Sequence, residues 1–156
     1  MRALVISDIH GDYTNLNSIL LSQSKAEVVF FLGDGEEDIE KIKHNFPNKM
    51  FVMVKGNCDW GSQLPVEQFF TLEGKKIMLT HGHAYDVKLT YNRIINTAKY
   101  NDCDVLLFGH THMPITLYEN GLYIMNPGTS CGYSATYGTL DITPQGIVTN
   151  IVNIKR

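Results

Sequence analysis

The chain has 156 residues, of which 44% are hydrophobic and 19% are charged, as in an ordinary globular protein with one domain. The formal net charge of −3 argues against nucleic acid as a partner, because proteins that capture it usually present a basic face. No apolar run approaches the roughly 20 residues that cross a bilayer, so we expect no membrane segment.

The three cysteines predict a reducing compartment. Cys58, Cys103 and Cys131 are odd in number and lack close spacing, which argues against a disulfide framework and against a zinc knuckle. The apolar run near the N-terminus is short and Asp8 interrupts it, which does not fit a cleaved leader. We therefore expect the protein to be cytoplasmic.

Strands and helices are expected to alternate in the first part of the chain. Short apolar runs predict strands buried on both faces; they cover Ala3–Ile9, Val28–Leu32, Met50–Val54, Ile77–Leu79 and Val105–Phe108. Apolar residues at helical spacing follow three of these strands and predict helices. They lie after the candidate N-cap Asp12, after the acids of "DGEED", and over Leu89–Tyr100.

Hairpins are expected among the later strands. The stretches "FFTLEGKKIML" and "ITLYENGLYIM" each place a glycine turn between apolar or alternating runs. A third, "YGTLDITPQGIVTNIVNI", turns at Pro144 to Gly146. Because strands outnumber helices, we predict an α/β protein with two layers of sheet flanked by helices.

Polar side chains follow all five predicted buried strands. The residues at these strand ends are Ser7 to His10, Gly33 and Asp34, Gly56 to Asp59, Thr80 to His83, and Gly109 to His112. Five of the six histidines lie there, and only His44, which we interpret as a surface residue, does not. Ligands bind at the carboxyl ends of strands in open α/β sheets, so we expect a binding site where these loops meet.

Each residue alone has a plainer interpretation. Asp8 could cap a helix, His10 could be a surface histidine, and Asp34 and Asn57 could be turn residues. The acids Glu36 to Asp38 fit the start of a helix better than catalysis. What these interpretations leave unexplained is that a carboxylate, amide or imidazole stands at all five strand ends.

The donor set predicts two metal ions. One structural zinc ion takes four ligands, whereas seven candidates are present: Asp8, His10, Asp34, Asn57, His81, His110 and His112. Mixed nitrogen and oxygen donors suit Mn, Fe, Co, Ni or Zn. Residues i and i+2 of a strand face one side, so His110 and His112 should project together, as should Asp8 and His10. Gly82 and Gly109 would let the chain curl at these ends.

The charge of such a site indicates its substrate. Two divalent cations outweigh two carboxylates and a bridging hydroxide, so the site would attract a phosphate ester. Two metals about 3.5–4 Å apart also activate a bridging water and stabilise the charge that builds on phosphate oxygens. Metal-assisted hydrolysis of a small phosphoester is the leading hypothesis.

Five ordered motifs resemble those of the calcineurin-like metallophosphoesterase superfamily: "SDIHG", "GDGEED", "KGNCDW", "THGH" and "GHTHMP". The cysteine of "GNCD" and the later "NPGTS" are similar to the small bacterial and archaeal phosphodiesterase branch. This resemblance spans almost the whole chain and implies one such domain over residues 1–156. It implies the αββα fold, a sandwich of two β-sheets flanked by helices, with the metal site at one edge.

The resemblance also implies how the donors are shared. One ion would be held by Asp8, His10, Asp34 and His112. The other would be held by Asp34, Asn57, His81 and His110, with Asp34 bridging. The implied reaction is hydrolysis of a phosphodiester by the hydroxide that bridges both ions, with Mn²⁺ as the first candidate metal and Ni, Fe, Co or Zn as alternatives.

Cys58 is a departure from the wider family, which often has a histidine there to bind phosphate and protonate the leaving group. Cysteine is a poorer acid near neutral pH unless its pKa is shifted, so a preference for good leaving groups is expected. Asn57 and His83 are the candidate substrate contacts, and His83 and Cys58 the candidate catalytic groups, with a rim position as the alternative for His83. Asp59 could orient His10 or cap its own loop. An arginine that some relatives carry after "NPGTS" is missing.

Another class of function stays open. A eukaryotic relative in this branch, the vacuolar sorting subunit 29 of retromer, works chiefly as a scaffold and also lacks the histidine of the third motif. A complete set of metal ligands therefore does not by itself indicate catalysis. A scaffold would need an exposed apolar patch remote from the metals. We also expect that the chain could form a homo-oligomer.

Overall fold

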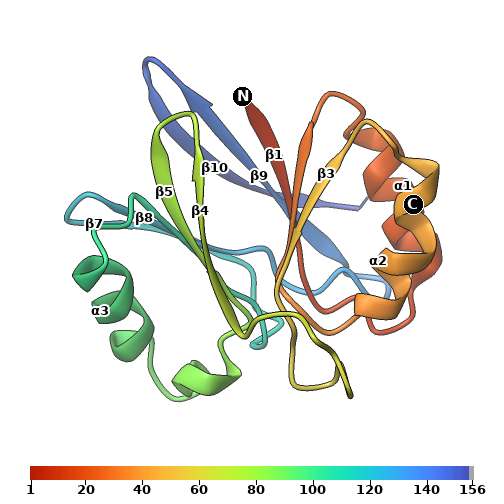
Figure 1. Cartoon of the computed structure of the whole chain (residues 1–156), viewed down its shortest axis with the longest axis horizontal. Coiled ribbons are helices and arrows are strands. Elements are labelled where there is room, and N and C mark those ends of the chain that lie inside the picture. The colour runs from red at the N-terminus through yellow and green to blue at the C-terminus, as the bar shows by residue number, and fades with distance from the viewer. Residues whose placement is uncertain (155–156) are drawn as a thin grey trace.

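Two five-stranded β-sheets pack face to face in the computed structural model, which describes residues 1–154 (Figure 1). The first sheet has the order β10-β9-β1-β2-β3. Its strands are β1 (Arg2–Ile6), β2 (Val28–Phe31), β3 (Met50–Met53), β9 (Thr136–Thr143) and β10 (Gly146–Asn153). The central strands β1, β2 and β3 run parallel, and β9 joins β1 antiparallel.

The second sheet has the order β4-β5-β6-β8-β7. It contains β4 (Glu67–Leu72), β5 (Lys75–Thr80), β6 (Val105–Leu107), β7 (Ile115–Glu119) and β8 (Leu122–Asn126). Its central strands β5, β6 and β8 are parallel, while β4 and β7 are attached as antiparallel hairpin partners. Both sheets therefore bring the carboxyl ends of their parallel strands to an edge.

Helices cover the outer face of each sheet (Figure 1). The helices are α1 (Tyr13–Ser22), α2 (Glu36–Ile42) and α3 (Asn92–Tyr100), with the short 3₁₀ helices η1 (Lys43–Asn45) and η2 (His83–Tyr85). Buried side chains of α1 and α2 pack with those of β1 and β2, and α3 packs with β5, β6 and β8. The predicted class, two layers of sheet flanked by helices, is confirmed.

Burial on both faces explains why the central strands are continuously apolar. Along β1, Leu4 and Ile6 pack under the helices, whereas Ala3 and Val5 pack against the opposite sheet. Because successive side chains of a strand alternate between faces, a strand enclosed by two layers needs an apolar residue at every position.

The predicted hairpins are confirmed, and several boundaries differ from expectation, most of the strand ends by one or two residues. Strand β1 ends at Ile6 rather than Ile9, because Asp8 takes a left-handed backbone conformation with φ 54° that no strand accommodates. Helix α3 begins at Asn92 instead of Leu89, whose side chain is exposed. The helix expected after "DGEED" ends at Ile42, and the chain continues as η1. Asp12 is the N-cap of α1, since its carboxylate accepts a hydrogen bond from the Asn15 amide.

None of the helices in residues 1–154 is both long and apolar enough to cross a membrane. The three cysteines are free thiols in the structure. Cys58 is exposed, Cys103 is buried and Cys131 lies between these extremes.

Packing between the two sheets predicts the effect of truncating Phe30. Its side chain is fully buried and meets the ring of Phe70 edge-on, with the ring centroids 5.7 Å apart. We expect Phe30→Ala to lower the free energy of unfolding in urea by about 3–5 kcal/mol, through lost transfer energy and the cavity that remains. Leu21→Ala, on the exposed side of α1, should change it by less than about 0.5 kcal/mol. Equal losses in the two variants would contradict this description of the core.

Candidate metal centre

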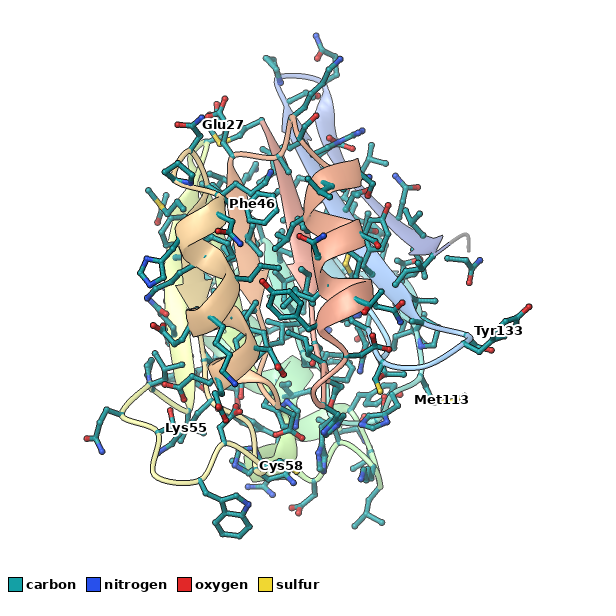
Figure 2. The ribbon with its side chains drawn as sticks, turned by 90° about the vertical axis from the view of Figure 1, so that its right-hand side faces the viewer. Glu27, Phe46, Lys55, Cys58, Met113 and Tyr133 are labelled. Atoms are coloured by element: carbon teal, nitrogen blue, oxygen red, sulfur yellow. The ribbon has the colours of Figure 1, made fainter. Side chains whose placement is uncertain are left out.

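All seven predicted metal donors lie at one end of the molecule. They occupy the loops that follow β1, β2, β3, β5 and β6, so the two sheets contribute to a common site. Figure 2 shows Cys58, which neighbours the donor Asn57, at the end opposite Glu27. The carboxyl ends of parallel strands from both sheets thus form the floor of this site.

Left-handed backbone, and not strand alternation, turns most donors inward. Asp8, His10 and Asp34 have φ values of 54°, 46° and 60°, and His110 and His112 have 67° and 59°. Asp8 and His10 do converge, with Oδ1 and Nε2 3.7 Å apart, but strand alternation is the wrong reason, because β1 and β6 end before the donors. Such conformations cost of order 1–3 kcal/mol each outside glycine and persist only where the surroundings enforce them. The strain is therefore concentrated at the site.

Asp8 directs one carboxylate oxygen into the cluster. Oδ2 accepts hydrogen bonds from the Ser7 hydroxyl at 2.6 Å and the His110 amide at 3.1 Å. Oδ1 is buried and has no hydrogen-bond partner within the described chain. It faces the Nε2 atoms of three histidines: His112 at 3.1 Å, His10 at 3.7 Å and His81 at 3.9 Å. A buried carboxylate oxygen that lacks a donor is costly unless a cation neutralises it.

Asp34 lies between the two halves of the cluster. Its Oδ1 accepts a hydrogen bond from the Cys58 amide at 2.7 Å, and its Oδ2 lies 3.3 Å from His81 Nε2 and 3.9 Å from His10 Nε2. Burial by itself would raise the pKa of this carboxyl group, but hydrogen bonds from His81 and Cys58 hold it well below the ordinary value. Asp34 is therefore an ionised acceptor within reach of both groups of histidines.

His81 has a fixed tautomer. Its Nδ1 lies 2.7 Å from the Leu32 carbonyl oxygen, which can only accept, so Nδ1 carries the proton. In the neutral ring Nε2 would carry a lone pair, yet it lies 3.1 Å from the amide oxygen of Asn57 and 3.2 Å from Nδ1 of His110. Because the Asn57 oxygen can only accept, a proton on Nε2 or a metal cation must lie between His81 and Asn57. Backbone anchoring of one ring nitrogen is how proteins commonly orient a metal-binding histidine.

The histidine pKa values agree with a site that requires positive charge. Burial lowers the pKa of His81, but Asp34 and Asp8 outweigh it, so the net shift is upward. Burial and the charge of His81 lower the pKa of His110 to about 4. A protonated His81 and a neutral His110 can coexist, and a metal bound at Nε2 of His81 would replace that proton.

The residues present fit divalent metal ions. Each of two subsets, Asp8 with His10 and His112, and Asp8 with Asp34 and His81, has its ligand atoms within 4.8 Å of one another. Carboxylate, amide and imidazole donors of this mixture suit borderline metals. The orphaned Oδ1 of Asp8 and the crowded Nε2 of His81 are the two observations on which this fit depends.

The remaining candidates lie beside the cluster. Cys58 is exposed, and its sulfur accepts a hydrogen bond from the Asn57 side chain at 3.3 Å. Burial and the nearby Asp34 raise the pKa of the Cys58 thiol. The ring of His83 lies 5.5 Å from that of His81 and 6.2 Å from that of His110, centroid to centroid. Its Nδ1 is buried and has no hydrogen-bond partner in residues 1–154. His44, as predicted, is exposed and outside the site.

Asp59 holds the loops that carry Asp34 and Asn57. One carboxylate oxygen accepts hydrogen bonds from the amides of Asp34 and Gly56, both at 2.8 Å. The other accepts from the amides of Gly35 at 2.9 Å and Glu36 at 3.0 Å. Of the two alternatives considered for Asp59, the loop cap is therefore the one that the structure supports, and it extends to a second loop. The spacing of the sequence motif did not indicate that contact.

The "NPGTS" segment, residues 126–130, holds the loops of His110 and Asp8 in place by hydrogen bonds. The sequence motifs did not indicate this role. Asn126 donates from its side-chain amide to the Gly109 carbonyl at 2.8 Å and the Thr111 hydroxyl at 3.0 Å. The Thr129 hydroxyl donates to the Asp8 carbonyl at 2.8 Å. These contacts join three loops that are distant in the sequence, which is why residue patterns alone could not reveal them.

Gly109 lets its loop approach Ser7 and Asp8 closely, which a side chain at this position would prevent. It does not supply the backbone curl that was expected there. Its φ is not positive, but a Cβ atom there would lie 2.0 Å from the Ser7 hydroxyl oxygen and 2.9 Å from Oδ2 of Asp8. Gly82 does have the left-handed φ of 105° that the expected curl requires.

A family model described as the calcineurin-like phosphoesterase superfamily domain matches residues 1–145. The chain is 33% identical to "Probable metallophosphoesterase YsnB" of Bacillus subtilis (strain 168) over 129 residues, covering 83% of this chain and 75% of that protein. It is 34% identical to "Vacuolar protein sorting-associated protein 29" of Schizosaccharomyces pombe, covering 85% and 73%.

A third relative has both a curated sequence and a solved structure. "Phosphodiesterase YfcE" of Escherichia coli (strain K12) is 28% identical, with coverage of 90% of this chain and 88% of that protein. The solved structure of YfcE, described as a phosphoesterase from E. coli, superposes with a TM-score of 0.68 over 99% of this chain and 100% of its own, at 26% identity.

Removal of the Asp59 carboxylate should weaken metal binding, although Asp59 is not itself a metal donor. We expect Asp59→Ala to weaken metal binding by about 10- to 100-fold, as the loss of groups that orient ligands typically does. Asp59→Asn, which keeps one acceptor oxygen, should recover part of this loss. Isothermal titration of the metal-free protein with Zn²⁺ measures the affinity of each variant. Glu119→Ala, which removes a remote exposed carboxylate on β7, is the control and should bind Zn²⁺ as wild type does. Wild-type affinity in Asp59→Ala would show that the loops hold their shape without Asp59.

Proposed function

This chain belongs to the calcineurin-like phosphoesterase superfamily, and on that premise we propose that it hydrolyses small phosphodiesters with two divalent metal ions. One observation carries the proposal: Asp34 presents an ionised oxygen to histidines on both sides of the cluster. A carboxylate in that position is suited to bridging two ions. The buried, unpaired Oδ1 of Asp8 supports the same conclusion, because it needs a cation nearby.

We assign the donors to two ions that share Asp34. Asp8, His10 and His112 would hold the first ion, and Asn57, His81 and His110 the second. Short distances within each group support this division: His10 and His112 are 3.3 Å apart at Nε2, while His81 lies 3.1 Å from Asn57 and 3.2 Å from His110. Mn²⁺ is the metal that we propose first, with Ni, Fe, Co and Zn as alternatives.

When bound, two divalent ions supply a hydroxide nucleophile at neutral pH and stabilise the charge that builds on the phosphate oxygens. The protein's own contribution is positioning. Leu32 fixes the tautomer of His81, Asp59 fixes the backbone around Asp34, and Asn126 fixes the loop between His110 and His112. Such preorganisation avoids reorganising the ligands during the reaction.

His83 is the protein group that we propose to contact the phosphate or the leaving oxygen. Its ring lies beside those of His81 and His110, and its buried Nδ1 lacks a partner within residues 1–154. Asn57 and Cys58 would line the same side of the substrate. Because a cysteine replaces the histidine of the wider family, we propose a preference for diesters with good leaving groups.

A scaffold role remains the second candidate, and the similarity to Vps29 of S. pombe is the observation that favours it. Exposed apolar side chains remote from the cluster, including Leu117 and Tyr118 on β7, provide surface for such a role. Metal binding is compatible with both functions, so hydrolysis distinguishes them. A cytoplasmic location and a homo-oligomer are further parts of the proposal.

Loss of the bridging carboxylate should abolish activity and reduce metal content together. We expect wild type to bind two metal equivalents per chain and to hydrolyse an aryl phosphodiester faster than the matching monoester. Asp34→Asn and His110→Ala should each lower kcat/KM by at least about 100-fold, since they remove groups that hold the metals. His44→Ala is the matched control, because His44 is exposed on η1 and should leave both readouts unchanged.

Metal analysis and hydrolysis of diester and monoester panels measure these effects. Two bound metals without hydrolysis in wild type would favour the scaffold. Full activity in both Asp34→Asn and His110→Ala would exclude the proposed centre.

The two catalytic candidates should differ in their effect on turnover. We expect His83→Ala to reduce kcat for aryl diesters by about 100-fold with an unchanged metal content, since positioned acids and bases typically contribute 10²–10⁴-fold. Cys58→Ser should change kcat by only a few fold. Steady-state kinetics over nitrophenyl esters with leaving groups of different pKa measures both. If His83→Ala kept wild-type kcat for every leaving group, the rim alternative for His83 would be correct.

A further inference from the structure

A hollow beside the metal centre is not used by the proposed reaction. This second hollow, distinct from the one at the metal donors, has a volume of about 480 Å³ and lies between the start of α2 and the loop over residues 58–62. It shares Glu37, Cys58 and Asp59 with a hollow of about 460 Å³ that His10 and Asp34 line. The two hollows are therefore neighbours, and an ester group of a substrate whose phosphate lies at the cluster would extend toward the hollow beside α2.

Trp60, the single tryptophan of the chain, lines this second hollow. Its side chain is 91% exposed, so almost none of the indole is covered by the protein. The backbone beneath it is nevertheless fixed, because the Trp60 amide donates to the Cys58 carbonyl at 3.1 Å and Asp59 anchors the neighbouring loop through four amides. The attachment point of the indole is thus fixed at the edge of the hollow, while its aromatic face is bare.

The charges of the hollow select against anionic groups. Glu36, Glu37 and Glu40 line it, but Glu37 is paired with Lys41 and Glu40 with Lys43, each at 2.6 Å. Asp59 also lines the hollow, and its carboxylate accepts hydrogen bonds from four backbone amides. Three of the four carboxylates therefore have partners. The net negative charge of the lining disfavours a second phosphate without forming a concentrated site for a cation.

We propose that this hollow binds an uncharged ester group that carries a planar aromatic ring, such as a nucleoside, with the ring stacked on the indole of Trp60. The inference rests on the proposed function, because it places the phosphate of the same molecule at the metal centre. It makes the substrate a diester in which one alcohol component carries an aromatic ring and no further phosphate is present. Stacking of a base on an aromatic side chain is worth about 5- to 150-fold in affinity by alanine substitution.

The test compares three diesters with poor leaving groups on the protein loaded with Zn²⁺: adenosine 5′-methyl phosphate, dimethyl phosphate and choline methyl phosphate. Calorimetric titration gives each Kd. We expect the adenosine ester to bind at least about 5-fold more tightly than dimethyl phosphate in wild type. Trp60→Ala should remove this advantage, Trp60→Phe should retain most of it, and Tyr100→Ala, an equally bare aromatic at the end of α3, should leave it intact.

Fluorescence of wild type locates the contact, since Trp60 is the only tryptophan. The adenosine ester should quench it with the calorimetric Kd, and dimethyl phosphate should not. Three results would overturn the proposal. The adenosine ester could keep its full advantage over dimethyl phosphate in Trp60→Ala, or the choline ester could show an equal or larger advantage in wild type. The third is an equal loss of affinity for all three ligands in Trp60→Ala. If wild type hydrolyses no diester but shows the Trp60-dependent binding, the proposed reaction fails and this binding site stands.

Discussion

The buried negative charge of Asp8 and Asp34 is the constraint on which this structure depends. Both carboxylates are withdrawn from water at the ends of buried strands, and the exposed fractions of the two residues are 0% and 3%. Buried carboxylates are tolerated only with close compensation, and the protein gives Oδ1 of Asp8 no hydrogen bond within the described chain. Imidazoles surround the two acids, and their lone pairs cannot neutralise a charge unless they hold a proton or a metal. The arrangement of the site is therefore that of a cation-binding cluster.

The strain and bracing around the cluster follow from that constraint. Five donors take left-handed backbone conformations that residues other than glycine rarely adopt. They are kept there from outside by Asp59, which ties the loops after β2 and β3, and by Asn126, which ties the loop after β6. Gly109 lets the loop of His110 approach Ser7 and Asp8 closely enough for the His110 amide to reach the carboxylate.

The layered fold and the membership of the site were predictable from the sequence, because both follow from one-dimensional patterns. Continuous apolar runs reflect strands enclosed on both faces, and polar residues after each run reflect the edge where the strands end. Backbone handedness at Asp8, His10 and His112 was not predictable, because these residues deviate from the strand conformation that their neighbours share. The contacts of Asp59 with the Asp34 loop and of Asn126 with the Gly109 loop join segments far apart along the chain. The residue pattern of a single sequence contains no signal for such pairs.

The position of Asp34 between two metal ions is the central claim, and anomalous diffraction tests it most directly. Crystals of the full chain grown with Mn²⁺ should show two anomalous peaks about 3.5–4 Å apart, with Asp34 contacting both. One peak should lie among Asp8, His10 and His112, and the other among Asn57, His81 and His110. A single peak, or two peaks of which Asp34 contacts only one, would contradict the account.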